Sequence, residues 1–79
     1  MDRQKIESKV KEILVDVLGI KPDLVMYDTN LKADLKADSL DFVELIINAE
    51  HEFGISIKDE EAAKCEKVKD IYDLIEKSL

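Results

Sequence analysis

The sequence predicts an all-α protein, a four-helix bundle with a short third helix and a long loop between helices 1 and 2. Apolar residues recur at steps of three and four with charged residues between them, which is the period of amphipathic helices. Two glycines and one proline are the strongest helix breakers in the 79 residues, and they fall between the helical stretches. A chain of this length forms one domain, residues 1–79, with a small core.

The first helix is predicted to end at Gly19. Its apolar positions follow the helical period and are Ile6, Val10, Ile13, Leu14, Val17 and Leu18. Gly19 supplies a C-terminal stop, and Pro22 keeps the helix from resuming. Residues 23–37 form a long loop, which we expect to be pinned across the core by spaced apolar residues: Leu24, Val25, Leu31 and Leu35.

The second helix is predicted to begin near Asp38. This residue is a suitable N-cap, and Asp41 lies at the third helical position, as in a capping box. Gly54 ends the helix. A broad apolar face is expected along it, made of Leu40, Val43, Leu45, Ile46, Ile47, Ala49 and Phe53.

Two shorter helices follow. Residues 55–57 alternate like a strand, but with no second run to pair with they are interpreted as a connector. Residues 59–61 are all acidic and open a short helix that extends to about Cys65, because acidic side chains favour a helix N-terminus. The last helix is defined by Val68, Ile71, Tyr72 and Ile75.

The composition excludes several classes of function. Nineteen acidic residues against 12 basic ones give a net charge of −7, which disfavours nucleic acids and favours protein partners with basic patches. No segment reaches the length of a membrane span, and the N-terminus lacks the apolar run of a signal peptide, so we expect no membrane insertion. One cysteine and one histidine exclude an internal disulfide and a zinc site. We expect no metal, a free-standing monomer and a reducing, cytoplasmic setting.

Ser39, the residue after the predicted N-cap, is the candidate functional residue. A serine nucleophile needs a base within hydrogen-bond reach, but the one histidine, His51, lies about 18 Å further along the same helix at about 1.5 Å per residue. Triad chemistry is therefore excluded, and the chain is not expected to be an enzyme. A calcium loop beginning at Asp28 also fails, because Ala33 replaces its glycine and Ser39 replaces its final glutamate.

The position of Ser39 suits a phosphate ester. The first turn of a helix has unbonded N–H groups and a partial positive charge, and both favour phosphate. An Asp-Ser pair before an apolar run is also what simple helix capping produces. The residues by themselves leave both interpretations open.

The segment from Asp34 to Leu45, DLKADSLDFVEL, closely resembles the attachment motif of acyl carrier proteins. The similarity continues through Phe53, residues 57–62 and the last helix, in the same order and spacing. The resemblance implies that Ser39 carries 4′-phosphopantetheine, transferred from coenzyme A by a phosphopantetheinyl transferase in a magnesium-dependent reaction. The terminal thiol would carry acyl groups as thioesters to fatty acid synthesis enzymes, which we expect to dock through basic patches.

The resemblance also assigns partner-binding and cargo-binding residues. Those expected to bind partners are Asp38, Asp41, Glu44, Ile47 and Glu50. Helical spacing independently places residues 41, 44, 47 and 51 on one stripe, which would steer a basic enzyme surface. Those expected to line an acyl pocket are Leu45, Ile46, Ala49, Ile57, Ala62 and Cys65. The cysteine is interpreted as a small buried apolar residue without a redox role.

Several positions depart from the family pattern. Lys36 stands where many members have glycine, His51 where an acid is common, and Lys58 where proline is frequent. Ala49 and Cys65 are smaller than the aliphatic residues common at their positions. These departures leave open a specialised carrier for polyketide, lipid A or another acyl transfer pathway. The alternative of another class is a small acidic helical adaptor without a prosthetic group.

Overall fold

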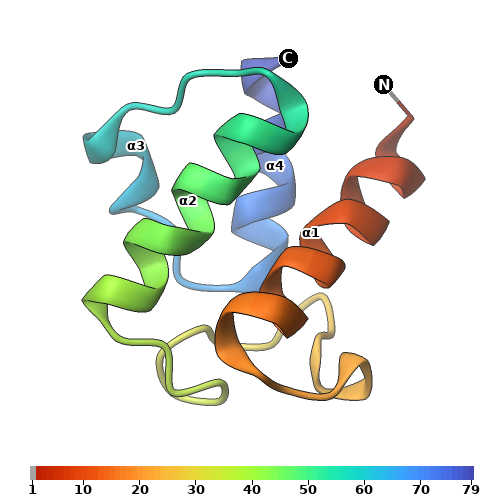
Figure 1. Ribbon diagram of the computed structural model, residues 1–79, viewed down its shortest axis with the longest axis vertical. Helices are drawn as coiled ribbons and strands as arrows, with labels where there is room; N and C mark the ends of the chain where they lie inside the picture. The colour runs from red at the N-terminus through yellow and green to blue at the C-terminus, as the bar shows by residue number, and fades with distance from the viewer. Residues whose placement is uncertain (1) are drawn as a thin grey trace.

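The computed structural model describes residues 2–79 and is built of helices (Figure 1). These are α1 (Arg3–Leu18), a short 3-10 helix (Pro22–Leu24), α2 (Ser39–Phe53), α3 (Asp59–Ala62) and α4 (Val68–Ser78). Within the described range the β-type pairing amounts to one isolated bridge, between Asn30 and Lys67. The predicted all-α fold, with its short third helix and long first loop, is confirmed. No helix in residues 2–79 combines the length and apolar character that crossing a membrane requires.

Both predicted glycine stops are confirmed. Gly19 and Gly54 each have a φ of 64°, in the left-handed region that glycine enters without a steric penalty. Their N–H groups donate to the carbonyls of Val15 and Glu50, which satisfies the last turns of α1 and α2.

The core between the helices is almost entirely aliphatic. The most completely buried side chains are Ile6, Val10, Leu14, Leu31, Val68, Ile71 and Ile75. Among the described residues no buried side chain is polar or charged. Burial of each such aliphatic side chain contributes about 1.5–3 kcal/mol, so this small core is the main stabilising feature of the fold.

The long loop is held against the bundle rather than free in solvent. Val25, Leu31 and Leu35 are buried in the core, as predicted. Leu24 is exposed, so the prediction that it helps to pin the loop is wrong. It belongs to the short 3-10 helix, and its neighbour Val25 is the residue that points inward.

Backbone hydrogen bonds also join this loop to the start of α4. The Leu31 N–H donates to the Glu66 carbonyl at 2.9 Å, and the Val68 N–H donates to the Thr29 carbonyl at 3.0 Å. In Figure 1 the loop and the first turn of α2 lie at the same end of the bundle, opposite the start of α1 and the end of α4. The loop therefore forms part of the scaffold on which α2 begins.

Arg3 fastens the first turn of α1 to the rest of the fold. Its guanidinium forms ion pairs at 2.8–3.1 Å with three carboxylates: Glu7, Asp73 and Glu76. It also donates to the Tyr27 hydroxyl at 3.0 Å and lies 5.6 Å from the centroid of the Tyr72 ring. One side chain thus links α1, the long loop and α4.

Two details of the predicted helices need correction. The short helix α3 ends at Ala62 and not at Cys65, because the chain then tightens into turns in which Lys64 and Cys65 donate to carbonyls three residues back. The apolar face of α2 is also not continuous. Leu45, Ile46, Ala49 and Phe53 are buried, whereas Leu40, Val43 and Ile47 face solvent. Residues 55–58 have no regular structure, which confirms that they form a connector.

Candidate functional site

Ser39 occupies the first position of α2, next to the predicted capping box. The Asp38 carboxylate accepts the Asp41 N–H at 2.8 Å, and the Asp41 carboxylate accepts the Asp38 N–H at 3.2 Å. The capping box is therefore confirmed. Within residues 2–79 the N–H groups of Ser39 and Leu40 have no hydrogen-bond partner, so they remain available to an outside acceptor.

The geometry at Ser39 fits an attached phosphate. Its side chain is exposed, and the capping is done by Asp38, so the hydroxyl is not used by the fold. The free N–H groups and the positive end of a 15-residue helix favour a negatively charged ester there. The residues present therefore fit a phosphopantetheine group held covalently on Ser39.

Ser39 is an acceptor without a base of its own. His51 lies on the same straight helix, about 18 Å away at about 1.5 Å per residue, and its side chain is exposed. In the part of the chain that the structure describes, no group of three or more histidine, cysteine, aspartate or glutamate side chains could hold a metal ion. An enzyme that modified Ser39 would have to provide the activation itself.

A row of exposed apolar side chains follows Ser39 along α2. Leu40 is 79% exposed, Val43 55% and Ile47 57%. Of these, only Ile47 was expected to contact partners; Leu40 and Val43 were assigned to a single broad apolar face. A helix turns about 100° per residue, which places this row nearly opposite the buried residues of α2. That angular separation was the signal in the sequence that could have identified Leu40 and Val43.

The predicted partner-binding acids lie in different surroundings. Asp38 and Asp41 bind each other's backbone in the capping box, although both remain at the surface. Glu44 is exposed beside the apolar row, and its carboxylate has no partner within residues 2–79. We name the exposed surface formed by Leu40, Val43, Glu44 and Ile47 the α2 docking face, after the partner binding that the sequence leads us to expect there.

Glu50 differs from the other acids of α2. Its carboxylate is half-buried and accepts the backbone N–H of Ile57 at 2.8 Å. The side chain therefore turns toward the connector that leads to α3, and it lines the same hollow as Val43 and Ile47. The sequence pattern places Glu50 near the stripe but does not reveal this bond.

A hollow of about 450 Å³ lies between α2 and α3. Three of the six predicted acyl-pocket residues, Ile46, Ile57 and Ala62, line it. Leu45 and Ala49 are buried on the core side of α2 and are absent from its lining. The lining also includes Phe42, a half-buried residue that the sequence did not assign to it.

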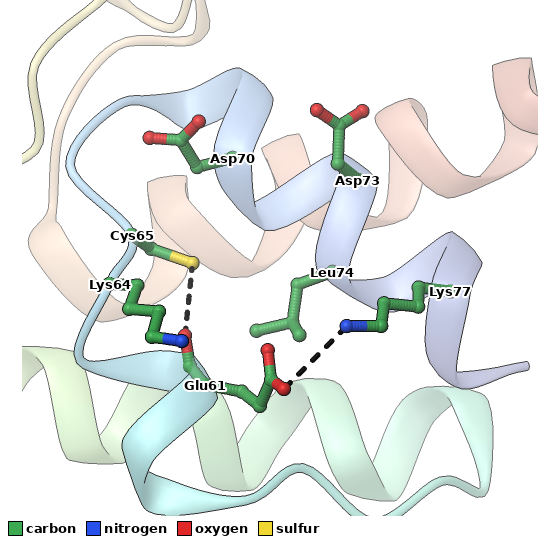
Figure 2. A pocket seen from close by; sticks show the side chains of 7 residues that line it. All are labelled: Glu61, Lys64, Cys65, Asp70, Asp73, Leu74 and Lys77. Carbon is green, nitrogen blue, oxygen red and sulfur yellow. Dashed lines mark hydrogen bonds and ion pairs between the residues drawn. The ribbon is translucent and has the colours of Figure 1, made fainter.

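Cys65, the sixth predicted pocket residue, lines a different cavity. Figure 2 shows this smaller cavity, of about 230 Å³, between the turn after α3 and one face of α4. The Cys65 thiol lies 4.0 Å from the carbonyl oxygen of Glu61. The nearby Lys77 pairs with the Glu61 carboxylate at 3.6 Å. Burial, together with the negative charges of Asp70, Glu61 and Asp73, raises the pKa of the Cys65 thiol to about 11. The thiol is therefore protonated at neutral pH. Cys65 packs against the core, but it is half-buried and not buried as the sequence predicted.

The exposed serine and the free N–H donors at the head of α2 fit one class of protein: a small helical carrier domain that accepts a prosthetic group. Comparison with known proteins identifies the group, because the family model "Phosphopantetheine attachment site" matches residues 8–75. The curated acyl carrier protein of Thermosynechococcus vestitus is 47% identical over 75 residues, which span 95% of this chain and 93% of that protein. The acyl carrier protein of Solidesulfovibrio magneticus is 49% identical over 72 residues, with 91% and 92% covered.

The solved structures agree with this result. The acyl carrier protein of Enterococcus faecalis matches the whole of both chains with a TM-score of 0.83 and 37% identity. The chain belongs to the acyl carrier protein family. As a member it carries a phosphopantetheine group and is not an enzyme, which removes the alternative of an adaptor without a prosthetic group.

Proposed function

We propose that this chain carries acyl intermediates of fatty acid synthesis as thioesters on a 4′-phosphopantetheine arm attached to the Ser39 hydroxyl oxygen. The observation that carries this proposal is the exposed Ser39 hydroxyl at the head of α2, inside the segment matched by the attachment-site family. When bound, the group supplies a thiol at the end of a flexible arm, and this thiol forms thioesters with acyl groups.

The residues around Ser39 prepare it for attachment. The Asp38–Asp41 box fixes the first turn of α2, so the hydroxyl is presented without having to cap the helix. The N–H groups of Ser39 and Leu40 point out of the helix end and can hold an oxygen of the phosphate ester. Since His51 is about 18 Å away and the Asp38 and Asp41 carboxylates accept backbone N–H groups, the phosphopantetheinyl transferase is the source of the base that removes the hydroxyl proton.

The α2 docking face suits partner enzymes that present apolar side chains within a basic patch. Its three exposed apolar residues supply area whose removal from water favours binding. Glu44 and the acids at the head of α2 add negative charge, which steers and orients a basic partner. The transferase and the fatty acid synthesis enzymes are the partners that this function requires.

The hollow between α2 and α3 suits the start of an acyl chain. Its walls include Ile46, Ile57 and Ala62, so an alkyl chain that enters it leaves water for an aliphatic surface.

We also infer a cytoplasmic location, because the single cysteine is free, as is usual in reducing compartments.

Intact mass after incubation with coenzyme A and a phosphopantetheinyl transferase tests the attachment. The wild-type chain should gain the mass of one phosphopantetheine group, and Ser39→Ala should gain none. Ser56→Ala is the matched control, because Ser56 is an exposed serine outside α2 and should leave the mass gain intact. Ser39→Ala should melt close to the wild type, since Asp38 still caps the helix. No gain on the wild type, or an equal gain on Ser39→Ala, would refute the proposal.

A further inference from the structure

Glu50 holds the connector between α2 and α3 at two points. Its backbone carbonyl accepts the Ile55 N–H at 3.1 Å, and its carboxylate accepts the Ile57 N–H at 2.8 Å. Within residues 2–79, the backbone N–H groups of Ser56 and Lys58 have no hydrogen-bond partner. The Glu50 side chain is therefore what fastens the middle of this connector to α2.

Ile57, the residue that Glu50 holds, forms a wall of the hollow between α2 and α3, which we call the acyl hollow. Ile57 is only 8% exposed and lines the hollow together with Ile46 of α2 and Ala62 of α3. Glu50 itself lies at the edge of the same hollow. Fixing the Ile57 backbone thus fixes the apolar wall that its side chain forms.

Apart from the packing of Ile57 and Ala62 in the core, the other side-chain ties on this part of the chain are weak. The helix α3 has four residues, and Glu61 pairs with Lys77 of α4 at 3.6 Å across largely solvent-accessible side chains. The Glu50 bond is shorter and charge-assisted, and its acceptor is half-buried, so it is the stronger restraint. The bond occupies one of the two carboxylate oxygens, Oε2, and thereby directs the Glu50 side chain toward the connector.

We propose that Glu50 is a positioning residue, which closes the acyl hollow by holding Ile57. The inference rests on the proposed function, because the hollow matters only in a chain that carries acyl groups. Glu44 supplies the matched comparison: it is a glutamate on the same helix whose carboxylate is free.

Three substitutions at Glu50 separate the hydrogen bond from the charge. Glu50→Gln removes the charge but keeps an oxygen that can accept the Ile57 N–H. Glu50→Asp keeps the charge, but its side chain is one methylene shorter and no longer reaches the Ile57 N–H. Glu50→Ala removes both the charge and the hydrogen-bond acceptor. If Glu50 acts by position, Gln should behave like the wild type, and Asp should behave like Ala.

The first measurement uses the protein without its arm and is independent of loading. Amide hydrogen exchange at Ile57, followed by NMR, should become about tenfold faster or more in Glu50→Ala and Glu50→Asp, as expected for the loss of a charge-assisted hydrogen bond. Glu50→Gln should stay within a few-fold of the wild type, and Glu44→Ala should leave this exchange unchanged. Equal exchange at Ile57 in the wild type and Glu50→Ala would overturn the inference.

The second measurement uses the chain loaded with an octanoyl-phosphopantetheine group from octanoyl-coenzyme A. Hydroxylamine should cleave the thioester faster in Glu50→Ala and Glu50→Asp than in the wild type, because the hollow no longer shelters the acyl chain. Glu50→Gln should restore the wild-type rate. A Gln variant that cleaves as fast as Ala would show that charge and not position matters, and would overturn the inference. Failure of the proposed function would give a different result: the wild-type chain would gain no mass on incubation with coenzyme A and the transferase.

Discussion

Replacing Lys36 with glycine should stabilise the fold. Lys36 has a φ of 60°, and within residues 2–79 it is the one non-glycine residue in the left-handed region. A side chain there brings Cβ close to the following carbonyl oxygen, at a cost of about 1–2 kcal/mol. Glycine escapes this strain but loses more backbone entropy on folding, about 0.5–1 kcal/mol relative to alanine. The net gain expected for Lys36→Gly is about 0.5–1 kcal/mol in the free energy of unfolding.

Thermal unfolding followed by circular dichroism measures this gain. In a chain of this size 1 kcal/mol shifts the melting temperature by roughly 4–8 °C, so Lys36→Gly should melt about 2–8 °C higher. Lys36→Ala is the control, since it removes the same positive charge from an exposed site but keeps the strained backbone. Its melting temperature should stay near that of the wild type. If Ala and Gly raised the melting temperature equally, charge would be responsible and the strain argument would be refuted.

Three further predictions concern the rest of the bundle. Arg3→Gln should lower the free energy of unfolding by about 1 kcal/mol, because it leaves three carboxylates without their shared cation, and equal stability at low salt would contradict this. The backbone N–H groups of Lys67 and Glu66 hold the pKa of Asp70 below its ordinary value, so its contribution is present above about pH 4 and is lost as the pH falls through the folded-state pKa. The stability difference between the wild type and Asp70→Ala should therefore shrink in acid-titrated urea melts, and a constant difference down to pH 2 would refute it. With its pKa raised from 9.0 to about 11, Cys65 should react with iodoacetamide at pH 8 about tenfold more slowly in the folded chain than in urea, and equal rates would contradict the burial of its thiol.

Local signals in the sequence were sufficient for most of the helix boundaries. Gly19 and Gly54 end helices because each supplies the left-handed residue that a C-terminal cap needs. The pair of Asp38 and Asp41 specifies the start of α2, because both halves of a capping box lie within four residues of sequence. Ser39 is placed by the same local rule, so its exposure at the helix head was predictable.

Features that depend on contacts between elements were not predictable in this way. Helical spacing separates Leu40 and Val43 from the core residues of α2, but because all are equally apolar, the packing of neighbouring helices decides which side faces water. The bond from Glu50 to Ile57 joins residues seven apart across a turn, and its existence depends on the path of the connector. Cys65 was expected in the same pocket as Ile46, but the turn after α3 directs it toward α4.

The hydrogen bonds between the long loop and the start of α4 bear on how the chain folds as it is synthesised. The bonds from Leu31 to Glu66, Val68 to Thr29 and Lys69 to Tyr27 join positions 35 to 42 residues apart. The first two helices can therefore leave the ribosome without their connection being fixed, since its partners lie near the C-terminus. Such distant pairings raise the contact order and delay the last step of folding until residues 66–69 have emerged. A nascent chain stalled before those residues would hold Ser39 on a helix whose supporting loop lacks its backbone bonds to residues 66–69.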